Sequence, residues 1–161
     1  MESDLEETLT NSVLVLEEID ENLYRASNLW RPHHARGAFG GQIVGQALAA
    51  AGKTVADNLT LHSMHNYFIR AGDSSFPVIY NVTRTRDGAS FSSRTVVAIQ
   101  RGKPILTLQA SYHNDGGEVD VALQYQTKMP DVKHHSELLT SSSIMEAYIA
   151  NPNTPGRYFS L

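Results

Sequence analysis

Residues 39–55 read FGGQIVGQALAAAGKTV, and their apolar positions have the spacing of an α-helix. Four apolar residues recur at intervals of four, three and four positions, which puts them on one helical face: Val44, Leu48, Ala51 and Val55. Glycine and alanine fill most of the positions between them. The stretch therefore predicts a helix from about Gln42 to Val55 that is slim enough to be buried closely against a sheet.

Beyond Asp57 and Asn58, the apolar residues recur with a period of two, which is typical of β-strands with one buried face. Four stretches follow this pattern: residues 61–69, 78–85, 91–100 and 106–112. Asp87-Gly88 is a hairpin turn signal between the second and third of them. A helix followed by an antiparallel meander predicts an α+β fold in which the helix covers one face of the sheet.

Before the helix in the sequence, residues 14–25 predict two short extended pieces around an acidic turn. The first piece includes Leu14-Val15-Leu16. A helix is the alternative, because Leu16, Ile19 and Leu23 also fall on one helical face.

Residues 118–161 differ from the rest of the chain. They are polar, contain three prolines and show no alternation of apolar and polar residues. We expect a domain over residues 1–117 and a linker or docking tail over residues 118–161, with a short helix near Ser143 to Ala150.

The composition excludes several classes of protein. The chain has 161 residues, of which 41% are hydrophobic and 19% charged, as in an ordinary globular domain. It has no cysteine, so disulfides, zinc–thiolate sites and a cysteine nucleophile are excluded. Its acidic start lacks the basic region of a secretory signal, and its longest charge-free run is too short and polar to cross a bilayer. We expect a protein that is not secreted and has no membrane span.

Charge is distributed unevenly along the sequence. Residues 1–21 contain eight acidic residues and no Lys or Arg, whereas residues 25–103 contain ten basic and three acidic residues. This basic surplus could attract a polyanion, although arginines solvated on strand faces would give the same pattern. Nucleic acid is a poor candidate, because aromatic residues are not interleaved with the basic ones.

Two groups of residues are candidates for a site. The glycines before the helix, Gly40 and Gly41 among them, could let a phosphate or carbonyl oxygen approach the first helical amides; a tight turn without a ligand is the alternative. His62 and His65 lie three apart in a predicted strand, so we expect them on opposite faces and unable to share a metal. Either could be a general base or only a hydrogen-bonded histidine.

Other catalytic signals are sparse. No serine has the Gly-x-Ser-x-Gly setting of a hydrolase nucleophile. Gln109 is a polar residue on the strand face opposite Leu108 and Ala110, where its amide could polarise a carbonyl or hold a water. A structural hydrogen bond between strands is the alternative for Gln109.

Four motifs in order along the chain resemble one family. They are FGGQIVGQA at residues 39–47, LHSMHNYFIRAGD at 61–73, RDGASFSSR at 86–94 and QRGKPI at 100–105. They are similar to the thioesterase II family of acyl-CoA hydrolases, and the match extends from about Leu14 to His113. The resemblance implies a hotdog fold, in which an antiparallel sheet wraps a long central helix. It also implies hydrolysis of fatty acyl-CoA to free acid and CoA without a metal or redox cofactor.

The resemblance also implies that half of the usual chain is present. Family members have two hotdogs, and their catalytic aspartate, serine or threonine, and glutamine belong to the second one. We expect the present sequence to be the first hotdog with the start of the linker. Its helix has Ala47, Leu48 and Ala49 instead of an acid, and Gln109 alone has a place like that of a family catalytic residue.

Gln109 and His62 are the candidate catalytic residues, and Gly40, Gly41 and Arg94 are the candidate substrate-binding residues, with the CoA phosphates as partners of the basic region. The substrate is acyl-CoA, and the chain pairs with a second copy or a second hotdog domain. The location is the peroxisomal matrix in a eukaryote, and the cytoplasm otherwise. A non-catalytic module for dimerisation or acyl-CoA binding is the alternative function.

Overall fold

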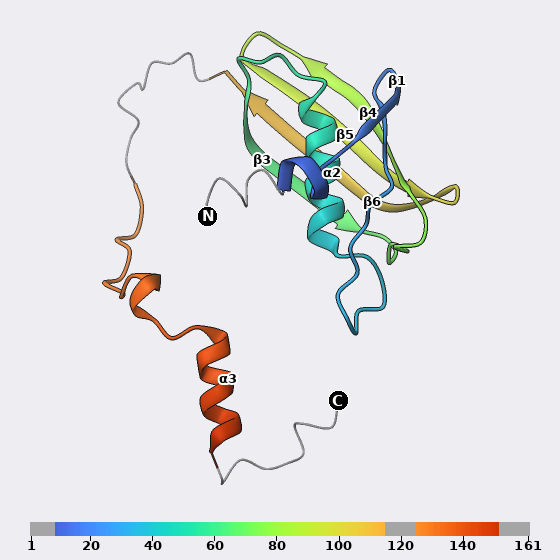
Figure 1. Cartoon of the computed structure of the whole chain (residues 1–161). Coiled ribbons are helices and arrows are strands. Elements are labelled where there is room, and N and C mark those ends of the chain that lie inside the picture. The colour runs from blue at the N-terminus through green and yellow to red at the C-terminus, as the bar shows by residue number, and fades with distance from the viewer. Residues whose placement is uncertain (1–8, 115–124, 152–161) are drawn as a thin grey trace. The chain divides into compact units, whose positions relative to one another are not determined.

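In the computed structural model, helix α2 (Gly40–Gly52) lies across one face of a six-stranded sheet (Figure 1). The structure describes residues 9–114 and 125–151. The chain divides into two units, Met1–Asp120 and Val121–Leu161. The predicted helix is confirmed, but it ends at Gly52 because the amides of Thr54 and Val55 bond to carbonyls only three residues back, at 3.1 and 3.3 Å.

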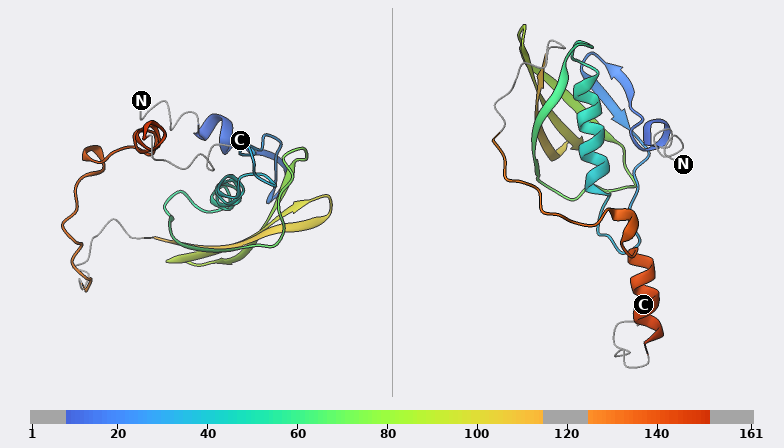
Figure 2. Two further views of the ribbon diagram at one scale, coloured as in Figure 1. Left: turned by 90° about the horizontal axis from the view of Figure 1, so that it is seen from below. Right: turned by 90° about the vertical axis from the view of Figure 1, so that its left-hand side faces the viewer.

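The sheet is antiparallel throughout, with strand order β1-β2-β4-β5-β6-β3. Its strands are β1 (Glu17–Asp20), β2 (Leu23–Ala26), β3 (Thr60–Phe68), β4 (Val78–Asp87), β5 (Phe91–Gln100) and β6 (Lys103–His113). All four stretches with alternating residues are strands, as predicted. The sheet curves around α2, so that the helix lies in its concave side (Figure 2).

The core lies between α2 and the concave face of the sheet. The sheet contributes alternate residues of its three central strands: Val78, Tyr80, Val82, Val96, Ala98, Leu106, Leu108, Ala110 and Tyr112. The helix contributes small side chains with little bulk, since Ala47, Ala50 and Ala51 have no exposed surface. This allows the close approach of helix and sheet that the sequence predicted.

The buried face of α2 differs in part from the predicted one, of which Ala51 alone is fully buried. Ile43 and Ala47 face the sheet, whereas Val44 and Leu48 are only half-buried and pack at the margin of the core. The helix is apolar nearly all round, so its sequence alone does not define one buried face.

The N-terminal segment forms a hairpin. β1 and β2 are the extended pieces around the acidic turn, and Asn22 in that turn has a φ of 59°. The helical alternative for this segment is therefore wrong. Leu14-Val15-Leu16 lies outside the strands, after a π-helical turn at Leu9–Val13.

β3 is an edge strand of the sheet, with β6 as its one strand partner among the described residues. Large apolar side chains on β3 are exposed, namely Met64, Tyr67 and Phe68. An edge with unpaired backbone groups and exposed apolar side chains is suited to pairing with another strand.

The second unit contains α3 (Ser141–Ala150), which confirms the predicted short helix. The Thr140 side chain accepts a hydrogen bond from the amide of Ser143 and so caps its start. All described residues of this unit are exposed. The predicted boundary after residue 117 falls among residues 115–124, outside the described residues, so the role of linker or docking tail stays a prediction. Among the helices that the structure describes, none has the length and apolar character needed to cross a membrane.

Candidate functional site

An apolar hollow of about 390 Å³ lies at the start of α2. Its walls come from the residues before and in the first turn of the helix, from the end of β3 and from β6, including Ala38, Gly40, Ile43, Phe68 and Ile105. The segments are joined by backbone hydrogen bonds: Ala38 donates to the carbonyl of Gly72 at 2.8 Å, and Ile69 donates to that of Ile105 at 2.8 Å. The hollow therefore has a hydrogen-bonded frame.

Two glycines of the first motif lie against phenylalanine rings that are themselves about half exposed. A β-carbon on Gly40 would lie 2.9 Å from Cζ of Phe68, and one on Gly41 would lie 2.6 Å from Cε1 of Phe39. Gly40 also borders the apolar hollow, whereas Gly41 is exposed beside Phe39. A role of either glycine in substrate binding stays a prediction.

The two glutamines of that motif hold the helix to the segment before it. Gln42 donates to the carbonyls of Val13 and Asn28 at 3.1 and 2.8 Å, and Gln46 donates to that of Val13 at 2.8 Å. The hydroxyl of Tyr80 in turn donates to Gln46 at 2.7 Å. Burial raises the pKa of Tyr80, which therefore stays neutral. Sequence reasoning missed these roles, although a polar residue within an apolar helix was the signal.

Gln109 and His62 lie together on the convex face of the sheet, away from α2. In the sheet register, Gln109 lies opposite His65 of β3 and Thr95 of β5. Its side chain is exposed, whereas its neighbours Leu108 and Ala110 are buried under the helix. A hollow of about 360 Å³ on this face is lined by His65, Gln109 and Ser111, among others. The sheet thus separates both candidate catalytic residues from Gly40 and the apolar hollow.

The expectation that His62 and His65 lie on opposite faces is wrong. The register between β3 and β6 shifts between Leu61 and Ser63, so strict alternation is lost at His62. Nε2 of His62 lies 2.8 Å from Oγ of Ser111, and Ser111 is on the same convex face as His65. Within the described part of the chain, no group of acidic or histidine residues could hold a metal ion.

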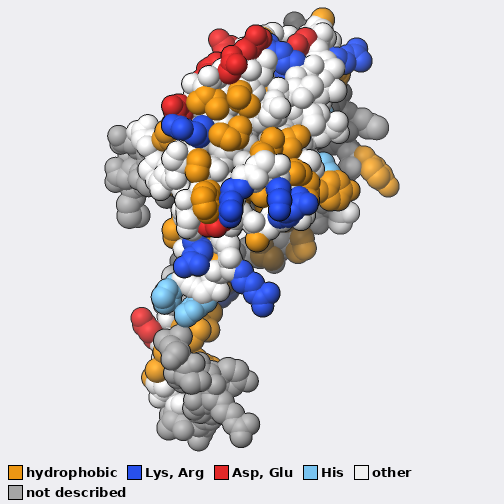
Figure 3. Space-filling model, turned by 90° about the vertical axis from the view of Figure 1, so that its right-hand side faces the viewer, with side chains coloured by type: hydrophobic (Ala, Val, Ile, Leu, Met, Phe, Trp, Pro, Cys, Tyr) orange, Lys and Arg blue, Asp and Glu red, His pale blue; other side chains and the backbone are white. Residues whose placement is uncertain are grey.

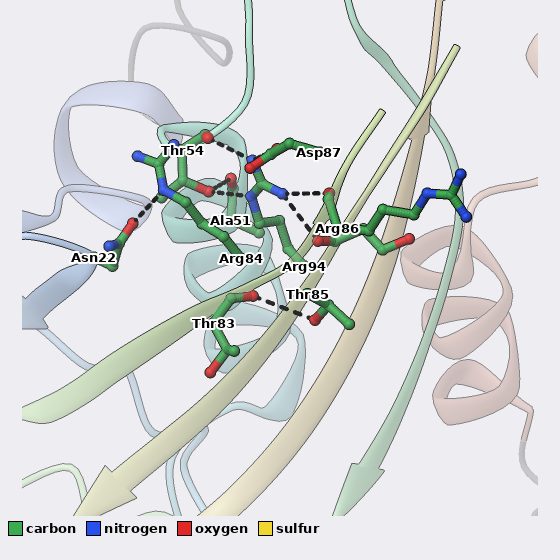
Figure 4. A network of polar contacts seen from close by, with 10 residues as sticks. Asn22, Ala51, Thr54, Thr83, Arg84, Thr85, Arg86, Asp87 and Arg94 are labelled. Carbon is green, nitrogen blue, oxygen red and sulfur yellow. Dashed lines mark hydrogen bonds and ion pairs between the residues drawn. The ribbon is translucent and has the colours of Figure 1, made fainter. Parts of the chain in front are cut away.

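Arg94 is at the opposite end of α2 and is 1% exposed (Figure 4). Nε and Nη2 donate to the hydroxyl and carbonyl of Thr54 at 2.7 and 2.8 Å, and Nη1 donates to the carbonyls of Arg86 and Ser93 at 3.0 and 2.9 Å. Nη2 also pairs with Asp87, and this hydrogen bond lowers the pKa of the Asp87 carboxyl. Arg94 therefore joins the end of α2 to the β4–β5 hairpin. Its role in substrate binding stays a prediction.

α2 itself supplies no carboxylate. α2 contains no acidic residue, and the three positions at its middle are Ala47, Leu48 and Ala49. The apolar hollow can hold an apolar chain, but its walls offer no group that could act as a general base.

Comparison with solved structures identifies the fold. A protein of unknown function from Alicyclobacillus acidocaldarius, described as having a hot dog fold, is 17% identical and superposes with a TM-score of 0.65 over 80% of this chain and 47% of its own. The thioesterase II TesB2 from Mycobacterium marinum is 35% identical and superposes with a TM-score of 0.63 over 76% of this chain and 43% of its own. The first unit is a hotdog domain of the α+β class.

Sequence comparison identifies the family. Residues 28–113 match the model of the acyl-CoA thioesterase N-terminal domain. Human acyl-coenzyme A thioesterase 8 is 46% identical over 155 residues, which are 96% of this chain and 47% of that protein. A peroxisomal acyl-coenzyme A thioester hydrolase of Saccharomyces cerevisiae is 31% identical over 81% of this chain and 38% of its own length. The chain belongs to the acyl-CoA thioesterase family, and it spans less than half the length of these relatives.

Proposed function

We propose that this chain is the amino-terminal hotdog of an acyl-CoA thioesterase, which hydrolyses fatty acyl-CoA to a free fatty acid and CoA. One observation carries the proposal: a hotdog with an apolar hollow at the start of its helix matches relatives named acyl-CoA thioesterases over nearly its whole length. An apolar hollow of about 390 Å³ suits part of an acyl thioester.

The chemistry requires more than the described residues offer. Attack of water on a thioester needs a general base or a group that holds the water, and donors for the developing oxyanion. α2 has no carboxylate for the first task. The Gln109 amide could orient a water, and His62 could accept a proton, but both are on the far side of the sheet from the hollow. We therefore expect the second hotdog to supply the base.

Pairing with a second hotdog, or with a second copy of the chain, is the second part of the proposal. The exposed apolar side chains of β3 and the half-buried Val44 and Leu48 of α2 support it, because a partner would remove this surface from water. Activity would then depend on which partner is present.

A non-catalytic role in dimerisation or acyl-CoA binding is the second candidate function. It is favoured by the same absence of a carboxylate on α2. Binding of acyl-CoA without turnover, both by two copies of the chain and by the chain paired with a second hotdog, would establish this non-catalytic role.

The proposed location is the peroxisomal matrix. Its support is the name of the yeast relative, at 31% identity. A fluorescent fusion of the complete protein in its own cells, compared with a peroxisomal marker, tests this.

The decisive experiment measures release of free thiol from a panel of acyl-CoA substrates. The chain is assayed alone and after mixing with the carboxy-terminal half of human acyl-coenzyme A thioesterase 8. That protein is chosen because the part of it that matches this chain is 46% identical. Turnover only in the mixture is expected. Turnover by the chain alone would show that two copies build a working site, and absence of turnover in both would refute the proposed function.

A further inference from the structure

The apolar hollow continues into a second hollow of about 340 Å³ with a different character. The two share Arg70, Ala71 and Ile105 as walls, so they adjoin. The second one is lined by three basic side chains, Arg70, Arg101 and Lys103. Figure 3 shows Lys and Arg side chains lying among hydrophobic ones on one face of the molecule.

The buried side chain of Gln100 holds the segments around the second hollow together by hydrogen bonds. Gln100 is 6% exposed, and its side chain accepts from the amide of Asp73 and donates to the carbonyls of Asp73 and Phe76, each at 2.8 Å. These bonds hold the loop 73–76 against the end of β5. They also place the Phe76 ring under Arg101, whose guanidinium carbon lies 4.8 Å from the ring centroid.

Two of the basic side chains are held by the fold. Arg70 donates to the carbonyl of Pro104 at 2.7 Å, which keeps its guanidinium beside the β5–β6 turn. Arg101 is in that turn with a φ of 50°, a backbone conformation that costs a non-glycine residue free energy. Gly102 follows with a φ of 73°, and positive φ at both central residues is what a two-residue hairpin turn requires, so the turn fixes the backbone from which the Arg101 side chain projects.

The charge balance of this hollow favours an anion. Three basic side chains face one carboxylate, Asp73, whose Oδ1 already accepts from the amide of Ser75 at 2.9 Å. A molecule that fits both hollows has an apolar or weakly polar arm joined to several negative charges. CoA thioesters have this arrangement, with a pantetheine arm and phosphate groups.

The rival basic hollow at the other end of α2 is less suitable. Its volume is also about 340 Å³, and it is lined by Arg84, Asp87 and Arg94 among others. The Arg94 guanidinium, however, is buried and already bonded to Thr54 and Asp87, which leaves it little capacity for a ligand. This hollow also shares no wall with the apolar one.

We propose that Arg70, Arg101 and Lys103 bind the phosphate groups of the CoA thioester, with its pantetheine arm crossing the adjoining apolar hollow towards Gly40. The proposal rests on the proposed function for the choice of ligand. It differs from the expectation that Arg94 contacts the substrate, since it assigns the phosphates to the β5–β6 turn at the opposite end of the helix.

The test compares two ligands and two double variants by isothermal titration calorimetry. Octanoyl-CoA has the phosphates, and S-octanoyl-pantetheine lacks them. Arg101→Gln with Lys103→Gln removes two charges from the proposed site, and Lys53→Gln with Arg86→Gln removes two exposed charges near the other end of α2. Loss of charge-assisted hydrogen bonds in the first variant is expected to weaken octanoyl-CoA binding about tenfold or more and to leave octanoyl-pantetheine unaffected.

Three results would overturn the inference: unchanged octanoyl-CoA affinity in the Arg101 and Lys103 variant, equal loss of both ligands, or a loss confined to the Lys53 and Arg86 variant. Absence of octanoyl-CoA binding to the unaltered chain would also overturn it. The mixture with the human carboxy-terminal half separates the two proposals. If the mixture turns over acyl-CoA and the Arg101 and Lys103 variant has an unchanged KM, only the phosphate-binding site is refuted. If the mixture with the unaltered chain shows no turnover, the proposed function is refuted, and the calorimetry still decides whether the phosphate-binding site exists.

Discussion

Replacement of Arg94 by alanine is expected to destabilise the first unit strongly. The change removes five hydrogen bonds that its guanidinium donates. It leaves the carbonyls of Thr54, Arg86 and Ser93 without this donor, next to a cavity in a site that is 1% exposed. An unsatisfied buried polar group costs about 1–3 kcal/mol, so we expect a loss of about 3–5 kcal/mol. That is a large part of the stability of an ordinary domain, about 5–15 kcal/mol.

The assay is urea unfolding followed by far-ultraviolet circular dichroism. Arg94→Lys is the milder variant, because it keeps the charge but cannot donate in the fork geometry of the guanidinium, and it is expected to unfold between the other two proteins. Asp87→Asn is the control, because it removes only the exposed partner and should change the midpoint far less. An Arg94→Ala protein with the unaltered midpoint would refute the reasoning and would return Arg94 to the role of a ligand-binding residue.

Three further predictions concern single residues. Tyr112→Phe is expected to raise the free energy of unfolding by about 1 kcal/mol, and with it the melting temperature, because the buried Tyr112 hydroxyl has no hydrogen-bond partner in the described structure. A lower melting temperature would show that the hydroxyl has a partner. The Arg94 hydrogen bond holds the pKa of Asp87 below its ordinary value of 3.8, so this stabilisation is complete above that value and is lost as pH falls through the lowered pKa. Asp87→Asn should therefore flatten the acid limb of a stability–pH curve, and an unchanged limb would contradict this. Gly37→Ala would put a β-carbon 2.5 Å from the carbonyl oxygen of Gly72; we expect a cost of about 1–3 kcal/mol in urea unfolding, and an unchanged midpoint would contradict the close approach.

Local patterns were sufficient for much of the fold. The period of two in β4 and β6 agrees with burial, since the alternating apolar residues Val78, Tyr80, Leu106 and Leu108 are all in the core. Side chains alternate across a strand whatever its neighbours are, so the sequence carries this information by itself.

β5 shows where such patterns fail. Residues 96–99 are Val-Val-Ala-Ile, so both faces of the strand are apolar. Alternation alone fits Val97 and Ile99 on the buried face as well as Val96 and Ala98, and in the structure the helix covers Val96 and Ala98. The same ambiguity affects α2, where nearly every position is apolar or small: of the predicted face, Ala51 is buried, but Val44 and Leu48 are only half-buried.

The candidate site, too, was predictable from the sequence only in part. The four motifs in order were enough to predict the fold and the family, because they extend over most of a hotdog and their spacing depends on the lengths of its elements. Gln109 was also placed correctly on the face opposite Leu108 and Ala110. No sequence pattern could show that His62 is in a bulge and bonds to Ser111, since the register shift depends on how β3 pairs with a strand more than forty positions later.

The amino-acid sequence by itself thus determined the elements, their order and the family, because helix and strand periods and motif spacing are properties of short segments. Only the tertiary structure decided the environment of each polar side chain. It buried Arg94 against Thr54, and it put Arg70, Arg101 and Lys103 beside one apolar hollow. The reason is physical: the burial and charge of a side chain depend on which distant segments pack around it, and that arrangement is set by the whole chain.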